Sequence, residues 1–397
     1  MDTRLATSIT YLSDMIRIDS RNTLALGAPG IREANEEDMA DYLTGKLNAL
    51  GFSVARQYPA PKRPNLIARH HVDDGLPTLA FNAHMDTVGT AGMSIDPFDP
   101  QVRDGRLYGR GSCDTKGSLA AMLTACETLI ATKTPINLLY IATCAEETGC
   151  QGSALLDLSG YTVDGVIVGE PTRNHLVVAH KCHATIELHC RGKAAHGSRP
   201  HLGDNAIYKA GHLLNYLETV TIPELARIKD EVFRDGCTLS VGIIAGGVKN
   251  NIVPDFCRLV CDFRLVPCVT APNEFFADMT ARASAALGFT VELQVVDISP
   301  AMHTAAEHPL PASIRTTLRQ YGLDDTPSGV AYCTDGGQLS AMGFPCVVMG
   351  PGDIAVAHSA VEYLELDQLQ QAGDLYVDIA KEFAKQGPRH CPPPSSN

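Results

Sequence analysis

The chain has 397 residues, of which 45% are hydrophobic and 19% are charged, and its formal net charge is −13 at pH 7. This length can form two domains with a sizeable core, while the acidic balance argues against nucleic acid or an anionic membrane surface as a partner. The N-terminus lacks an apolar signal core, and no stretch approaches the ~18 apolar residues that cross a membrane. We therefore expect a cytoplasmic globular protein.

Thirteen cysteines are scattered through the chain without CxxC spacing. Cys257 and Cys261 alternate on one face of a predicted strand, which favours core packing over a zinc site. The thiols are therefore expected to be reduced and mostly buried.

The first 84 residues alternate between helical and extended patterns. Apolar positions with a helical period fall within residues 2–19. After a Gly/Pro loop around residues 27–30, a second helical pattern runs from about 33 to 50, where Gly51 ends it. Three short strands are predicted at 52–57, 65–69 and 78–84.

Strand–helix alternation continues to residue 170. Residues 105–117 contain too many glycines for a regular element, and a helix is predicted from Ser118 to about 130. Apolar runs at 136–142, 164–169 and 344–350 predict further buried strands. This alternation is typical of an α/β protein whose mainly parallel sheet has helices on its faces.

The pattern changes at residue 183, beyond which apolar and polar residues alternate as in an antiparallel sheet with one exposed face. The runs are 184–190, 237–244 and 256–265, and a helix is predicted at 205–219. We therefore expect an inserted α+β domain at 183–295, between the two parts of the first domain at 1–182 and 296–387. The Pro/Ser-rich tail, 388–397, is expected to be disordered.

Four predicted strands end at, or lead into, residues of metal-ligand type. His84 ends one strand, Glu146 and Glu147 follow the next, Glu170 follows the third, and a Gly/Pro loop after the fourth leads to His358. In open α/β sheets, ligands bind outside the carboxyl ends of the strands. An isolated Glu-Glu pair can simply face solvent, but adjacent carboxylates at the end of a buried strand favour a nearby cation. The sequence thus indicates one shared metal site.

Asp114 lies just ahead of a predicted helix start, so it is either an N-cap or a carboxylate between two cations. The candidate metal ligands are His84, Asp114, Glu147, Glu170 and His358. Imidazoles and carboxylates suit zinc and related divalent ions. With Asp114 as a bridge, one metal would have His84 and Glu170, and the other would have Glu147 and His358.

Two further carboxylates have predicted roles beside these ligands. Asp86, two residues past His84, fits an acceptor that fixes the imidazole tautomer. Glu146 is adjacent to a ligand but is not needed as one, and it fits a general base that takes a proton from a water molecule acidified by the metals.

Taken together, the motifs resemble a known family. They are His84-Met85-Asp86-Thr87, Gly109-Arg110-Gly111-Ser112-Cys113-Asp114-Thr115-Lys116-Gly117, Glu146-Glu147, Gly169-Glu170-Pro171-Thr172 and His358. Their order and spacing are similar to those of the dizinc aminoacylase/carboxypeptidase family over residues 10–385. The resemblance implies two zinc ions per subunit, with cobalt or manganese as substitutes, a catalytic domain split by a dimerisation domain, and a homodimer.

Within this family, residues 179–183, 332–337 and 350–352 look most like acetylornithine deacetylase, an enzyme of arginine biosynthesis. Departures from the family pattern are Asp335 and a long loop at 25–36. The resemblance implies cleavage of the amide bond of an N-acyl amino acid. A succinyl-diaminopimelate desuccinylase, a dipeptidase or carboxypeptidase, and a metal-free binding protein on the same fold are the alternatives.

The resemblance also implies roles for residues in the inserted domain. His196 would reach the active site of the partner subunit, although alone it would be interpreted as a surface histidine. Arg264, with Asn250 and Asn251, would bind the α-carboxylate of the substrate. Outside the inserted domain, Gly336 is a further candidate for substrate binding. Without the family, Arg264 would be interpreted as a surface residue paired with Asp262 or another strand neighbour.

A thiol hydrolase is a different possibility, but no cysteine stands out with a paired histidine. A chelator separates the two classes, because it abolishes activity only in the metal-dependent one.

Overall fold

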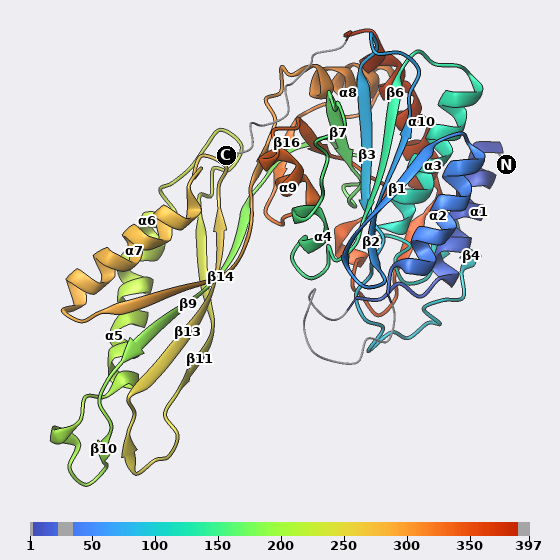
Figure 1. Ribbon diagram of the computed structural model, residues 1–397. Helices are drawn as coiled ribbons and strands as arrows, with labels where there is room; N and C mark the ends of the chain where they lie inside the picture. The colour runs from blue at the N-terminus through green and yellow to red at the C-terminus, as the bar shows by residue number, and fades with distance from the viewer. Residues whose placement is uncertain (1–2, 23–34, 388–397) are drawn as a thin grey trace. The chain divides into compact units, whose positions relative to one another are not determined.

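The computed structural model describes residues 3–22 and 35–387 (Figure 1). The predicted tail at 388–397 and most of the 25–36 loop lie outside the described residues. The chain forms two compact units, the first from residues 1–179, 302–329 and 334–397 and the second from residues 180–301 and 330–333. The boundaries proposed from the sequence, and the assignment of 183–295 to dimerisation, stay predictions.

The first unit alternates strands and helices along the chain. Its helices are α1 (Thr3–Arg17), α2 (Glu37–Ala49), α3 (Lys116–Ala131), α4 (Gln151–Ala154), α8 (Pro309–Gln320), α9 (Asp335–Ala341), the 3₁₀ turn Ile354–Val356 and α10 (Leu366–Ala384). Its strands are β1 (Ser53–Ala60), β2 (Arg63–His70), β3 (Thr78–His84), β4 (Gln101–Arg103), β5 (Arg106–Tyr108), β6 (Asn137–Thr143), β7 (Gly165–Val168), β8 (Val177–His180), β15 (Met302–His303), β16 (Ser328–Val330), β17 (Cys346–Val348) and β18 (Tyr363–Glu365).

The central sheet of the described chain has the order β1-β2-β6-β3-β7-β17-β8-β15, with β16 paired to β8. The four middle strands, β6, β3, β7 and β17, are parallel neighbours. Strands β1 and β2 join them in antiparallel pairs, so the sheet is mixed rather than uniformly parallel. Its parallel centre is buried, as the continuous apolar runs predict.

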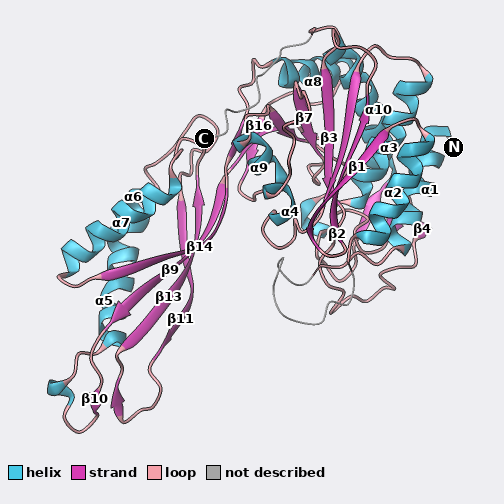
Figure 2. Cartoon of the chain, in the orientation of Figure 1, coloured by secondary structure: helices cyan, strands magenta, loops and turns pink. Residues whose placement is uncertain are grey.

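The main core lies between this sheet and a layer of helices (Figure 2). Alternate strand residues such as Phe81, Tyr140 and Ile167 belong to one buried cluster with α1, α3 and α10. The Tyr140 hydroxyl donates to the Leu119 carbonyl on α3 at 2.8 Å, and the Phe81 and Tyr376 rings lie 5.5 Å apart. These contacts hold β6 and β3 against the helix layer, and His84 is the last residue of β3.

The second unit is an antiparallel sheet with helices on one face. Its strands are β9 (Cys182–Arg191), β10 (Ala195–His196), β11 (Thr238–Gly246), β12 (Ile252–Val253), β13 (Phe256–Leu265) and β14 (Val291–Ser299). Its helices are the 3₁₀ turn Pro200–Leu202, α5 (Ala206–Tyr216), the π-helical turn Leu217–Thr221, α6 (Ile222–Leu225) and α7 (Pro272–Leu287). The four-stranded sheet has the order β11-β13-β9-β14.

Burial alternates along β9 and β13, as the sequence pattern predicts for a sheet with one exposed face. Cys257 and Cys261 lie on the buried face of β13 as free thiols. The predicted α/β class with a separate antiparallel α+β unit is therefore confirmed. Among the described residues, no helix is both long and apolar enough to cross a membrane.

Candidate metal centre

The candidate metal ligands of the first unit meet at the carboxyl edge of its parallel strands. His84 ends β3 and is in parallel register with Thr143, the last residue of β6. Glu147 lies four residues past that strand end, and Glu170 follows β7 by two residues. His358 is reached through the loop after β17, which is the parallel neighbour of β7.

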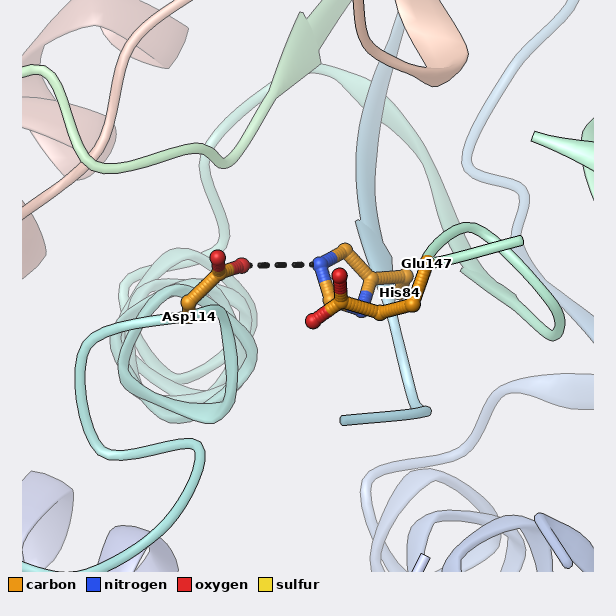
Figure 3. Close-up of side chains that lie close together, drawn as sticks. All are labelled: His84, Asp114 and Glu147. Carbon is orange, nitrogen blue, oxygen red and sulfur yellow. Dashed lines mark hydrogen bonds and ion pairs between the residues drawn. The ribbon is translucent and has the colours of Figure 1, made fainter. Parts of the chain in front are cut away.

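Asp114 lies between the two imidazoles. Its Oδ1 atom is 3.0 Å from His84 Nε2, and its Oδ2 atom is 3.1 Å from His358 Nε2. Figure 3 shows Asp114 and His84 facing one another, with Glu147 beside them. His358 Nε2 also lies 3.1 Å from Glu147 Oε2, and His84 Nε2 lies 3.9 Å from Glu170 Oε1. The structure thus brings all five candidate ligands together.

Protonation in this cluster reflects crowded carboxylates. Burial, and then the charge of Asp114, raise the pKa of Glu147 to about 7, and burial also holds the pKa of Glu170 well above its usual range. Burial alone would lower the pKa of His84, but hydrogen bonds to Asp114 and Asp86 outweigh it and raise that pKa. Hydrogen bonds to Asp114 and Glu147 raise the pKa of His358 to about 10.

These observations fit a site for divalent cations. Ligand atoms of His84, Asp114 and Glu147 lie within 4.8 Å of one another, and the carboxylates around them outnumber the imidazoles. Buried like charges shift one another toward the neutral form unless a cation lies between them. Oxygen and imidazole nitrogen donors are those that zinc and similar ions prefer.

Asp86 contacts both His84 and the turn after β6. The Nδ1 atom of His84 lies 2.8 Å from the backbone carbonyl of Asp86, and the Asp86 carboxylate is 3.5 Å away. The closer partners of that carboxylate are the backbone N–H groups of Glu146 and Glu147, at 3.1 and 3.2 Å. In this chain, the residue expected to orient the imidazole also anchors the Glu146-Glu147 pair.

Glu146 projects from a tight turn. Ala145 has a left-handed backbone with φ of 54°, and the N–H groups of Gly149 and Cys150 both donate to the Glu146 carbonyl. The Cys150 thiol donates to Glu146 Oε1 at 3.3 Å. Burial holds the pKa of the Glu146 carboxyl well above its usual range, which is the direction needed for a group that exchanges a proton near neutral pH.

Asp335, at the start of α9, is a buried carboxylate. Thr143 and Ser153 both donate to it, the latter at 2.5 Å. Its neighbour Gly336 is buried, and its N–H group donates to Thr334 Oγ1 at 3.0 Å.

A buried ion pair that the sequence analysis missed supports Asp114. Glu362 Oε1 accepts from the backbone N–H groups of Cys113 and Asp114 at 3.0 and 3.1 Å, while its Oε2 atom accepts from Arg110 at 2.5 Å. Each residue lies near a motif, since Arg110 belongs to the Gly-rich segment and Glu362 lies four residues past His358, but nothing in the sequence indicates that the two form a pair. Because Glu362 accepts these two N–H groups and is itself held by Arg110, we infer that the ion pair stabilises the loop that carries Asp114.

The candidates of the second unit lie on its surface. Strand β10 pairs with β12, opposing His196 and Ile252, and the Asn251 carbonyl accepts from Gly197 at 2.7 Å. His196, Asn250 and Asn251 are exposed. Arg264 donates to Asp262 from Nε at 3.0 Å and from Nη2 at 3.2 Å, which is the pairing expected without the family resemblance.

Comparison with known proteins places this chain in a family and agrees with its fold. The model of peptidase family M20/M25/M40 matches residues 80–382. Acetylornithine deacetylase of Myxococcus xanthus is 33% identical over 343 residues, which cover 83% of this chain and 88% of that protein. A probable succinyl-diaminopimelate desuccinylase of Staphylococcus epidermidis is 27% identical over 415 residues, covering 95% and 98%.

Solved structures show the same fold. Aminopeptidase PepT from Bacillus cereus superposes with a TM-score of 0.78 at 23% identity, covering 96% of this chain and 99% of that one. Human carnosine dipeptidase 1 superposes with a TM-score of 0.68 at 17% identity, covering 97% and 98%. The sheet and its clustered imidazoles and carboxylates define a metallohydrolase. The chain belongs to peptidase family M20/M25/M40.

Proposed function

We propose that this protein hydrolyses the amide bond of N-acyl amino acids, as an acetylornithine deacetylase does, with two divalent cations at the candidate metal centre. The observation that carries this proposal is the placement of Asp114 between the imidazoles of His84 and His358, 3.0 and 3.1 Å from them. A carboxylate with one oxygen toward each imidazole is suited to bridge two cations. Zinc is the preferred ion, and cobalt or manganese are substitutes with similar donor preferences.

His84 and Glu170 would hold one cation, Glu147 and His358 the other, and Asp114 both. Bound cations would supply Lewis acidity, polarising the amide carbonyl and lowering the pKa of a water molecule. Glu146 would take the proton from that water and deliver it to the leaving amine nitrogen, as one group acting first as base and then as acid. Asp86 would hold His84 in one tautomer through its backbone carbonyl.

The second unit would contribute to substrate binding. We assign Arg264, with Asn250 and Asn251, to the substrate α-carboxylate, because a guanidinium can bind a carboxylate through two parallel hydrogen bonds. In this chain Arg264 already donates twice to Asp262, so substrate would have to compete with that partner. His196 would act in the active site of a partner subunit, so the proposed enzyme is a homodimer. We further propose a cytoplasmic location.

A peptidase is the second candidate, since two structures that share the fold are named as an aminopeptidase and a dipeptidase. The test is a substrate panel offered to metal-free protein reconstituted with zinc. N-acetyl amino acids, N-succinyl amino acids and dipeptides are compared by kcat/KM, with Asp114→Asn as the inactive control. Preference for N-acetyl compounds supports the proposal, preference for dipeptides favours the peptidase, and activity that survives chelation contradicts both.

A further inference from the structure

Glu36 and Arg63 form an ion pair inside the first unit. Their side chains are 0% and 2% exposed, and Arg63 Nη2 donates to Glu36 Oε1 at 2.5 Å. A fully buried pair is a weak source of stability, since desolvating two charges offsets their attraction. The other contacts of this ion pair therefore indicate its role better than its contribution to stability does.

The pair holds the turn that carries Glu146. Glu36 Oε1 accepts the backbone N–H of Ala145 at 3.1 Å. Ala145 has the left-handed conformation, which costs free energy for a residue with a side chain and persists only where the surroundings enforce it. The Glu36 carboxylate is one of the groups that enforce it, one residue before Glu146.

A second branch reaches the same turn through Asn22 and Asp86. Arg63 Nη1 donates to Asn22 Oδ1 at 3.0 Å, and Asn22 Nδ2 donates to Asp86 Oδ2 at 2.9 Å. Asp86 in turn accepts the backbone N–H groups of Glu146 and Glu147. Asn22 Nδ2 also lies 3.3 Å from Thr148 Oγ1. The two branches thus fix three consecutive N–H groups, those of residues 145, 146 and 147.

We propose that Glu36, Arg63 and Asn22 are positioning residues, which form a buried network that fixes the backbone of residues 145–147 and thereby aims Glu146 at the reacting water. The inference rests on the proposed function insofar as Glu146 is the base. The hydrogen bonds described above lead from these residues to Ala145 and to Asp86, and they act through those two residues.

Two variants interrupt the network without stranding a charge. Asn22→Leu removes the link between Arg63 and Asp86 with a side chain of similar size. The double variant Glu36→Leu/Arg63→Met removes both members of the ion pair together, which is better tolerated than removing one. Glu36→Gln keeps an oxygen for the Ala145 N–H, and although neutralising one member of the ion pair lowers stability, it serves as the conservative variant for kcat.

The matched control is Asn137→Leu. Asn137 is also a buried asparagine with several hydrogen bonds to backbone groups, but it lies at the first residue of β6, at the end opposite the turn. It should lower the melting temperature and leave kcat unchanged at an assay temperature well below melting.

We expect Asn22→Leu and the double variant to lose roughly 10- to 100-fold in kcat, the usual effect of removing an outer support or displacing a catalytic group by about 1 Å. KM should change by less than about threefold, metal content should stay as in the wild type, and Glu36→Gln should keep most of the activity. Hydrogen exchange of a peptide spanning residues 143–151 should become faster in both variants.

Unchanged kcat in Asn22→Leu, an equal loss in Asn137→Leu, or loss of metal together with activity would each overturn the inference. If the wild type turned over no substrate on the panel, the proposed function would fail. The hydrogen-exchange comparison would then still decide whether the network holds the turn.

Discussion

At the scale of single residues, His180 shows how firmly the fold holds one protonation state. Its imidazole is fully buried, its Nδ1 atom lies 3.1 Å from the Lys181 carbonyl, and burial lowers its pKa to about 4. Between that value and the ordinary 6.5, the unfolded chain binds a proton that the folded chain does not. The free energy of unfolding contributed by His180 therefore falls as the pH falls through this window.

We predict that His180→Gln removes this part of the acid sensitivity. The difference in unfolding free energy between wild type and variant should be constant above pH 7 and shift by about 3 kcal/mol toward the variant by pH 4, as the pKa difference implies. Denaturant titrations of both proteins at several pH values measure it. If the unfolding free energies of the two proteins changed in parallel from pH 7 to pH 4, His180 would not titrate in this way.

Arg264 gives a prediction for substrate binding. Lysine cannot reproduce the two parallel hydrogen bonds of a guanidinium, and hydrogen bonds to charged groups contribute about 1.5–3 kcal/mol. Arg264→Lys should therefore raise KM roughly tenfold or more for N-acyl amino acids. The increase should be smaller for substrates whose α-carboxylate is amidated.

Asp262→Asn is the matched variant, because it weakens the pairing that Arg264 makes in this chain. It should leave KM unchanged or lower it. Equal losses on both kinds of substrate in Arg264→Lys would assign that residue a structural role.

Four of the five candidate ligands, His84, Glu147, Glu170 and His358, could be predicted because each ends or follows a strand pattern, and Asp114 because it lies in the Gly-rich segment ahead of a helix. Their supports could not. Arg110 and Glu362 are 252 positions apart, and Arg63 and Asn22 are 41 apart. The local sequence around a buried arginine does not predict which residue accepts its hydrogen bonds. That partner is determined by the packing of distant segments.

At the scale of elements, α4 packs backbone to backbone against the end of β6. A Cβ atom on Gly152 would lie 1.9 Å from the Cys144 carbonyl oxygen. Asn65 fixes the same contact, donating to the Gly152 carbonyl at 2.8 Å and accepting from the Cys144 N–H at 3.0 Å. Any side chain at residue 152 must push the helix away from the strand that leads to Glu146.

We predict that Gly152→Ala destabilises the fold by about 1–3 kcal/mol, the usual effect of overpacking, and also lowers kcat. Gly45→Ala is the control, since nothing lies within 4 Å of its Cβ position in α2 and alanine is preferred over glycine in a helix by about 1 kcal/mol. Thermal melting and kinetics of both variants test this. A Gly152→Ala protein with wild-type melting and kcat would refute the packing argument.

Element prediction from the sequence succeeded where the periodicity was strong. Strands β3 and β13 have the bounds expected from their patterns. Helix α7, strand β14 and the antiparallel pairing of β1 and β2 with the parallel strands were not predicted from the sequence. Strand direction depends on how distant segments assemble, and an apolar run of five to eight residues carries no direction of its own.

At the scale of the whole molecule, the proposal makes the active site composite, with His196 supplied by the partner subunit. His196→Ala and Glu146→Gln should each be nearly inactive alone. After mixing under conditions of proven subunit exchange, hybrid dimers would contain one site with both an intact His196 and an intact Glu146. Activity should then recover toward about a quarter of the wild-type level, because half of the dimers are hybrids and each has one working site.

Size-exclusion chromatography with light scattering establishes the dimer before mixing. No recovery despite subunit exchange would mean that His196 works in its own subunit or has no part in the reaction. The exposed position of His196 on the β10–β12 pair is compatible with a reach toward another chain, and the mixing experiment decides it.

The central claim is that Glu146 is the base of a metal-dependent amide hydrolysis and not a metal ligand. The most direct measurement is the metal content and kcat of Glu146→Gln beside those of the wild type, on the best substrate of the panel. We predict that kcat falls by ~10²–10⁴-fold, the usual contribution of general-base catalysis, while the variant keeps the same number of metal ions per subunit. Loss of metal in parallel with activity would make Glu146 a ligand, and an unchanged kcat would remove it from the reaction altogether.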